Sequence, residues 1–399
     1  MSALPSVRRR RTAIMLVANL LAILALGGIG YAGVRALKRY EGATKVGVDS
    51  IKLPVTPVGM FATVDADNQL TSVAVFVLTA GSQVGGSIVT VPVSSDSNPL
   101  PNGVDRIPLT QAYADGGAEA LVLAVESVLS VTIDVSAVAP PAEAEALLAP
   151  VSPLSATLPT DVQKTATGGD TDVVFPAGTT KLSAAQAVEV LTATADTQVS
   201  ADRRGNIDAV WAGVAAAVGD GRTTADVAVP IVSLADLMSH LFAARVESRG
   251  LPADPVAAAD NPDGKDVETL VRYEAVFVLA AIAPASMSAP STGLVFRIEA
   301  PPGYEDRVKF AVRAILFLGG NVVSVYLGAE VHEATRYYID DPRLVDEAES
   351  NNALFGITET LTPKIPIEGI DVILQLGTDF LNGAGDELPS TTTSTTEPA

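Results

Sequence analysis

The sequence predicts an α/β protein: a mixed central sheet flanked by helices, a smaller C-terminal α/β domain, and one N-terminal transmembrane helix. Three observations carry this prediction. Runs rich in β-branched residues follow one another in residues 57–98, as in neighbouring strands. Residues 294–327 show a strand–helix–strand pattern. Residues 12–34 are uncharged and mostly apolar, and a helix of that length spans the ~30 Å core of a bilayer.

The apolar run lies between two basic clusters. Arg8 to Arg11 precede it, and Arg35, Lys38 and Arg39 follow it. Basic residues before a first hydrophobic segment stay in the cytoplasm, and a long domain after it is translocated. We therefore expect a basic cytoplasmic tail over 1–11, a signal anchor over 12–34, and a single-pass protein of the cell membrane with an extracytoplasmic body.

Two alternatives concern this segment. A cleaved signal peptide would have an apolar core of ~7–15 residues, shorter than this run. Its weak cleavage site near Ala32 is followed by basic residues. Gly27, Gly30 and Gly33 share one helix face and would allow a homodimer, although they lack GxxxG spacing.

The composition excludes several classes of function. Residues 1–39 hold seven basic and no acidic residues, which leaves 19 basic and 46 acidic residues in the body, a net charge of −27. A nucleic-acid-binding body needs the opposite sign. The chain has no cysteine, so disulfides and thiolate metal sites are excluded. The two histidines, His240 and His332, lie in no recognisable catalytic or zinc motif.

The first domain is predicted over residues 40–283. Glycines 116 and 117 precede a helix, Ser183 is a suitable N-cap, and Trp211 faces the core of a later helix. The expected strands are 60–64, 70–79, 87–93 and 131–138, and the expected helices are 118–129, 140–148, 184–191 and 206–218.

The second half of the chain begins with a long loop over 250–266. Its residues 260–266 faintly resemble a calcium loop but lack the final bidentate glutamate, so we expect a solvated turn. A linker over 284–292 leads into the domain over 293–383, and 384–399 is a disordered Ser/Thr/Pro tail. The expected elements are strands 294–300 and 322–327 joined by helix 304–317, then strands 337–339 and 372–376.

The order of these elements resembles that of the LytR–CpsA–Psr family. The resemblance lies in segments 70–76, 90–92, 110–117 and 182–187. Residues 294–382, and most clearly 371–380, resemble the C-terminal LytR domain often joined to it. The resemblance implies enzymes that transfer glycopolymers from a polyprenyl-pyrophosphate carrier to the cell wall. In that family, arginines neutralise the pyrophosphate, and aspartates hold magnesium or act as a base.

This chain departs from the family at those positions. The family's first-strand aspartate corresponds to Thr71, and its paired arginines correspond to Thr192 and Thr194. Its Pro-Arg-Asp reads Pro92-Val93-Ser94, and its Arg-x-x-Arg-Gln-Gln run falls on Asn206, Ala209, Val210 and Trp211. Tyr113 and the glycine pair remain. The catalytic set is degenerate.

Five nearby residues are the candidates for a displaced site: Arg106, Asp96, Arg203, Arg204 and Tyr113. An active site built on the four charged ones would bring them together at the mouth of an apolar cavity and would use magnesium. Each also has a simpler interpretation, Tyr113 as a packing residue and Arg203-Arg204 as a solvated helix start. Without the displaced site, we expect no cofactor and no metal.

We therefore expect a non-catalytic envelope protein that binds or scaffolds, with polyprenyl lipid or cell-wall glycopolymer as its partner and no nucleic acid. The alternative is an active phosphotransferase that attaches polyprenyl-pyrophosphate-linked glycopolymer to the wall. A transcription regulator, the third class, is disfavoured by the acidic body and by the lack of a basic helix-turn-helix.

Overall fold

The computed structural model describes residues 50–98, 105–166, 168–289, 292–350, 352–357 and 359–383. The expected cytoplasmic tail, the signal anchor over 12–34 and the Ser/Thr/Pro tail lie outside these residues. Within the described ranges, no helix is both long and apolar enough to cross a membrane.

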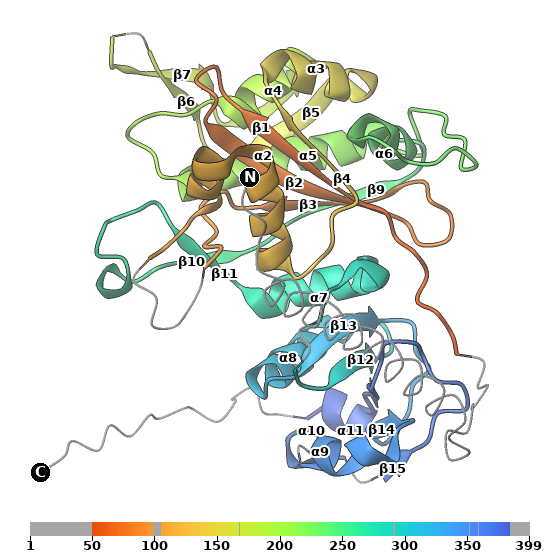
Figure 1. Cartoon of the computed structure of the whole chain (residues 1–399). Coiled ribbons are helices and arrows are strands. Elements are labelled where there is room, and N and C mark those ends of the chain that lie inside the picture. The colour runs from red at the N-terminus through yellow and green to blue at the C-terminus, as the bar shows by residue number, and fades with distance from the viewer. Residues whose placement is uncertain are drawn as a thin grey trace, which may run out of the picture. The chain divides into compact units, whose positions relative to one another are not determined.

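The first sheet has five strands in the order β4-β1-β2-β3-β9 (Figure 1). The central strands are antiparallel, and the edge strands β4 and β9 run parallel to their neighbours. Every residue of β1 and β2 is buried, so this sheet is covered on both faces. The strands are β1 (Val58–Val64), β2 (Leu70–Leu78), β3 (Gly86–Val91), β4 (Val135–Ala139) and β9 (Val246–Gly250).

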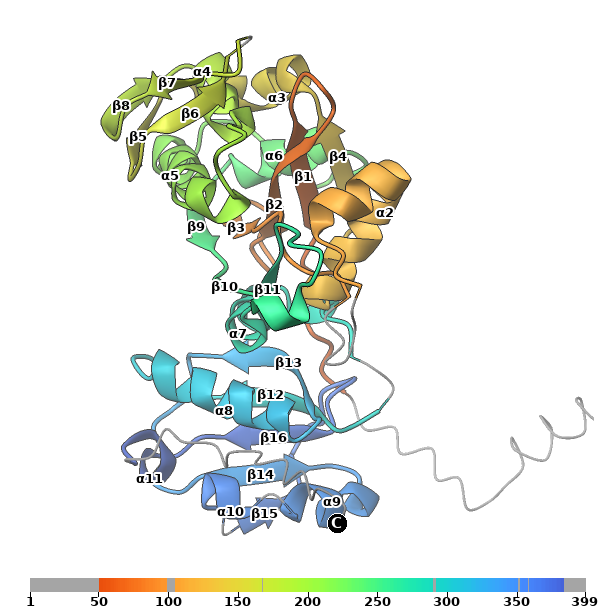
Figure 2. The ribbon, with the colours of Figure 1, turned by 90° about the vertical axis from the view of Figure 1, so that its left-hand side faces the viewer.

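Alternate residues of β2 enter two different cores. Val73, Val75 and Val77 join the core that includes α2. Ala74, Phe76 and Leu78 join the core under α3 to α6 (Figure 2). Trp211 fills the second core, with its ring edge-on to Phe76 at 5.4 Å. The helices are α2 (Leu109–Leu129), α3 (Pro141–Leu148), α4 (Ala184–Thr192), α5 (Ser200–Val218) and α6 (Leu234–Leu241). The predicted mixed sheet with flanking helices is confirmed.

Several element boundaries differ from the predictions. Helix α2 begins at Leu109, nine residues before the predicted start, and is kinked at Gly117, where φ is +66°. Helix α5 begins at Ser200, before the predicted start at Asn206. Its first turn is polar, and the apolar periodicity that predicted the helix starts only at Asn206. The strand predicted from residue 131 begins at Val135.

Two short antiparallel strand pairs were not predicted. Strand β5 (Leu154–Leu158) pairs with β8 (Gly178–Leu182), and β6 (Val162–Thr165) pairs with β7 (Thr171–Phe175). The predicted loop over 250–266 contains β10 (Ala253–Pro255) and a 3-10 turn, Ala258–Asp260, and β10 pairs with β11 (Glu268–Leu270).

A second five-stranded sheet has the order β13-β12-β16-β14-β15. The predicted strand–helix–strand unit is present: β12 (Val295–Glu299) and β13 (Asn321–Tyr326) are parallel neighbours joined through α8 (Glu305–Phe317). Gly319 ends the helix turn with a φ of +82°. The other elements are β14 (Arg336–Ile339), β15 (Glu359–Leu361), β16 (Val372–Gln375), α9 (Val345–Glu349), α10 (Asn352–Phe355) and α11 (Thr378–Leu381).

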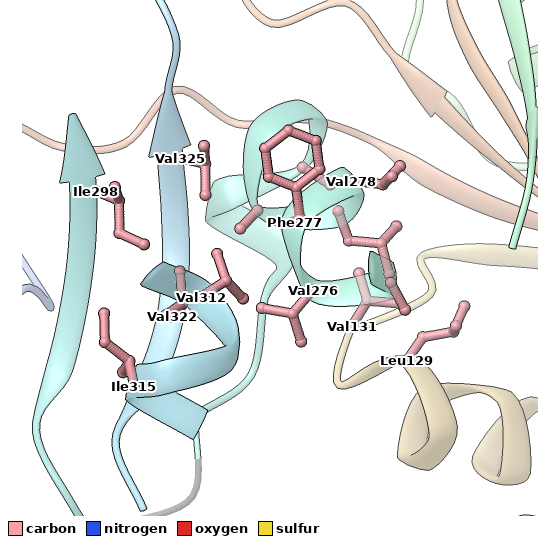
Figure 3. Close-up of a cluster of buried hydrophobic side chains, with 14 of the residues drawn as sticks. Leu129, Val131, Val276, Phe277, Val278, Ile298, Val312, Ile315, Val322 and Val325 are labelled. Atoms are coloured by element: carbon pink, nitrogen blue, oxygen red, sulfur yellow. The ribbon is translucent and has the colours of Figure 1, made fainter. Parts of the chain in front are cut away.

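Helix α7 (Arg272–Ile282) connects the two sheets through one continuous core (Figure 3). Its residues 275–280 are all buried, so the helix has no apolar stripe along one face. For this reason the helix was not predicted from the sequence. Val276 and Phe277 lie in the same hydrophobic cluster as Leu129 of α2 and Val322 of β13. An ion pair of 2.9 Å between Lys309 of α8 and Glu274, together with packing of Lys309 over the ring of Phe277, adds to this contact.

Replacing Phe277 should test this shared core. Phe277→Ala should lower the free energy of unfolding by about 3–5 kcal/mol, because it leaves a cavity between the two sheets. Urea denaturation followed by Trp211 fluorescence measures the effect on the first sheet, since Trp211 is the chain's single tryptophan. Leu123→Ala, at a side chain 66% exposed, is the control. An unchanged Trp211 midpoint in the Phe277 variant would contradict a core common to both sheets.

Candidate functional site

A groove of about 740 Å³ opens between the β1–β2 turn, the start of α3, strand β6 and helix α4. Its lining includes Thr192 and Thr194, the positions that the resemblance aligns with the family's paired arginines. We call it the acidic groove because of its charged lining residues. These are the carboxylates Asp65, Asp67, Glu145, Glu189 and Asp196, and the lysine Lys164.

Helix α4 lines one side of the groove. It begins with a capping box at Ser183, the N-cap that the sequence predicts. Ser183 Oγ accepts from the Gln186 amide at 3.2 Å, and Gln186 Oε1 accepts from the Ser183 amide at 3.0 Å. Residues 185, 188, 189 and 192 then fall on one helix face and line the groove. At the far end, Thr192 Oγ1 donates to the Val188 carbonyl at 2.9 Å, so this hydroxyl is already engaged.

The predicted turn between β1 and β2 forms the opposite wall of the groove. Asp65 Oδ1 accepts from the amides of Asp67, at 3.0 Å, and Gln69, at 2.8 Å. The hydroxyl of Tyr113, which lies on α2, donates to Asn68 Oδ1 in this turn at 2.9 Å. Tyr113 therefore braces the turn.

A network of buried charges lies outside the groove lining. Arg106 forms a 2.9 Å ion pair with Asp96, and their side chains are 10% and 0% exposed. The Asp96 amide in turn donates to the Glu268 carbonyl at 2.8 Å. The carboxylate of Glu268 pairs with Arg204 and accepts from Ser94 Oγ. Each buried charge in this network has a partner, as burial in a low dielectric requires.

Asp208 adds a third carboxylate beside this network. It lies on α5, accepts a hydrogen bond from Thr90 Oγ1, and faces the positive charge of Arg204. Burial raises the pKa of Asp208, and the bond from Thr90 and the charge of Arg204 oppose that rise without cancelling it. A carboxylate thus lies on the helix where the family carries arginines.

Arg203 points away from Arg204. Its Nη2 donates to the Leu191 carbonyl at 3.1 Å, next to the groove residue Thr192. Burial lowers the pKa of Arg203 to about 10, while the negative charges of Asp65 and Asp266 oppose this shift. Neither Arg203 nor Arg204 is exposed, so the expectation of a solvated helix start is wrong.

The five candidate residues therefore fall into two places. Asp96, Arg106 and Arg204 meet in the buried network through Glu268. Arg203 and Tyr113 instead contact the elements that wall the groove. Glu268, Asp208 and the groove carboxylates were not among the predicted site residues. These residues are far apart in the chain, and the only signal for them was the overall acidity of the body.

Residues at the positions that the resemblance aligns with the family's catalytic residues make structural contacts in this chain. Thr71 is buried and hydrogen-bonded to Thr63 at 2.8 Å, and Val93 is buried in the core. Asn206 donates to Thr160 Oγ1 at 3.1 Å, and Val210 and Trp211 are fully buried. Among the described residues, no three acidic or histidine side chains come together as metal ligands.

No family model and no curated protein matches the chain. Several solved structures are similar to it. One is YwtF (TagT), a LytR-CPS2A-psr family protein with bound octaprenyl pyrophosphate lipid. It is 16% identical, and the match covers 55% of this chain and 86% of YwtF, with a TM-score of 0.37. B. subtilis TagV is 12% identical over 60% and 100%, with a TM-score of 0.42. A LytR-Csp2A-Psr enzyme from Actinomyces oris is 16% identical over 61% and 96%, with a TM-score of 0.41. The likeness concerns the fold, and the activity of this chain has to follow from its own residues.

The raised pKa of Asp208 predicts a pH-dependent stability. The folded protein holds this proton more tightly than the unfolded chain does. The stability that the protonated carboxyl contributes is therefore lost as the pH rises above the pKa of an ordinary aspartate, about 3.8, toward the raised pKa of the folded state. Relative to Asp208→Asn, the wild type should therefore become less stable between about pH 4 and pH 7.

Urea denaturation across that pH range measures the difference. Asp172→Asn, at an exposed carboxylate on β7, controls for the loss of one charge. A stability difference between wild type and Asp208→Asn that stays constant with pH would show that burial does not perturb Asp208.

Proposed function

We propose that this protein is a membrane-anchored, extracytoplasmic member of the LytR–CpsA–Psr family that binds or scaffolds cell-wall glycopolymer or its polyprenyl carrier without transferring it. The proposed loss of transferase activity rests on one observation, the negative charge of the acidic groove. Where the resemblance places a pyrophosphate clamp, the described lining holds five carboxylates and one lysine.

The energetics disfavour a pyrophosphate at this position. Each charge-assisted hydrogen bond from an arginine is worth about 1.5–3 kcal/mol, and Thr192 and Thr194 supply none. A carboxylate about 4 Å from a phosphate charge adds repulsion of about 1 kcal/mol even in water. An anion in the groove therefore lacks attraction and meets repulsion.

The alternative, an active transferase with a displaced site, requires free arginines. Arg106 and Arg204 are each paired with a buried carboxylate, Asp96 and Glu268. Removing a partner from such a pair is costly, since it leaves an uncompensated buried charge. The arrangement of these residues favours a structural role over phosphate binding in the state described here.

A transfer assay tests the proposal directly. The full chain in lipid nanodiscs, given a polyprenyl-pyrophosphate-linked glycopolymer, peptidoglycan and magnesium, should neither attach polymer nor hydrolyse the pyrophosphate. An active transferase of the family serves as the positive control. Turnover at a comparable rate would overturn the proposal.

Restoring cations to the groove should restore anion binding. The double variant Thr192→Arg/Thr194→Arg should bind inorganic pyrophosphate at least about tenfold more tightly than the wild type, because each tenfold gain needs only about 1.4 kcal/mol. Isothermal titration calorimetry at low salt measures the affinities.

The matched control is Thr157→Arg/Thr179→Arg, which adds the same charge at an exposed threonine pair on β5 and β8. Equal pyrophosphate affinity of the wild type and the groove variant would show that the groove's charge does not limit binding.

A further inference from the structure

A small pocket opens where α8 ends, between the start of β12 and the helices α9 and α10. We call it the α8 pocket. Its floor is apolar and consists of Leu294, Phe296, Ile315 and Phe355, each at most 6% exposed. The pocket therefore reaches down to side chains that belong to the core of the second sheet.

Two exposed glycine turns line the pocket beside this floor. Gly293 precedes β12, and Gly319 ends α8. The turns approach so closely that a Cβ atom at Gly293 would clash with the carbonyl oxygen of Gly319. Since neither glycine has a side chain, nothing at these two positions covers the apolar floor.

The size of the pocket limits what can enter it. Its volume is about 170 Å³, close to the cavity of about 150 Å³ that binds benzene in an engineered protein core. Pockets for whole small-molecule ligands are larger, about 300–1,000 Å³. The α8 pocket therefore admits one apolar group of the size of a phenylalanine ring, and the remainder of any partner has to lie outside it.

The surface beside the pocket is apolar as well. Leu318, which lines the pocket, is 44% exposed, and Phe317 before it is 45% exposed. Exposed apolar groups that adjoin a pocket and have polar residues around them are typical of interaction sites. The apolar surface thus extends beyond the pocket, as a partner larger than the pocket requires.

The charge around the pocket is negative. Glu347 of α9 lines it, and Asp346 and Glu349 of the same helix are exposed. The last carbonyls of α8 carry partial negative charge toward the same end of the helix. None of the described lining residues is basic. A cation next to the inserted apolar group is therefore favoured over an anion.

We propose that the α8 pocket anchors a peptide segment of another protein. The segment inserts one phenylalanine-sized side chain into the pocket and places a neighbouring lysine or arginine against Glu347. Protein interfaces concentrate their binding energy in this way, on one anchor in a desolvated pocket surrounded by weaker contacts. The inference goes beyond the proposed function, since no residue of the acidic groove takes part in it.

Three end-capped peptides test the size and the charge of the pocket: Gly-Lys-Phe-Lys-Gly, Gly-Lys-Ala-Lys-Gly and Gly-Glu-Phe-Glu-Gly. Saturation-transfer NMR with the full chain in nanodiscs of zwitterionic lipid measures their affinities, with empty nanodiscs as the background. The first peptide should bind at least about tenfold more tightly than the second, because only its ring is buried. It should bind at least about threefold more tightly than the third, because an exposed ion pair contributes less. Equal affinity for the first peptide and either of the others overturns the proposal.

A pair of double variants assigns the binding to this pocket. Leu318→Ala/Glu347→Gln should weaken binding of Gly-Lys-Phe-Lys-Gly at least about tenfold, since it removes an apolar wall and the lining carboxylate. Leu123→Ala/Glu330→Gln makes the same changes at exposed residues outside the lining and should stay within about twofold of the wild type. The same loss of affinity in both variants overturns the proposal.

A second copy of the chain is the other occupant to be tested. Sedimentation velocity at rising protein concentration should show the same oligomeric state for the wild type and for Leu318→Ala/Glu347→Gln. Self-association that only this variant abolishes would mean that another copy covers the pocket, and it would overturn the assignment to a peptide partner. Turnover in the transfer assay would overturn the proposed function and leave this inference unaffected.

Discussion

The ion pair between Glu268 and Arg204 is the contact on which the polar interior of the first half depends. Glu268 neutralises Arg204, accepts the Ser94 hydroxyl, and through its backbone joins the segment that carries the Asp96–Arg106 pair. A charge taken out of water has to be compensated nearby, so each of these residues constrains the next. As a result, arginines near the expected phosphate site serve the fold.

The same constraint separates the two regions of the site. Inside, cations and carboxylates balance in pairs. At the surface, the acidic groove keeps an excess of carboxylates that water can solvate, at little cost to stability. A groove lined by five carboxylates and one lysine repels an anion. The proposed binding role follows from this difference between the balanced interior and the acidic groove.

Much of the architecture could be predicted from local patterns. Strands β1 to β4 of the first sheet, the cap at Ser183, the core position of Trp211 and the β12–α8–β13 unit all follow from periodicity and capping chemistry within short windows, whereas β9 was not predicted. Prediction failed where the pattern was absent. Helix α7 is buried on all sides, and the first turn of α5 is polar, so neither shows an apolar stripe.

The amino-acid sequence alone determined the acidity of the body and the absence of cysteine, because these are matters of residue identity. Only the tertiary structure decided which charges meet. Glu268 and Arg204 are 64 residues apart, and Ser94 is 174 residues from Glu268. Electrostatic pairing acts over a few ångströms, so the fold alone brings such partners within range.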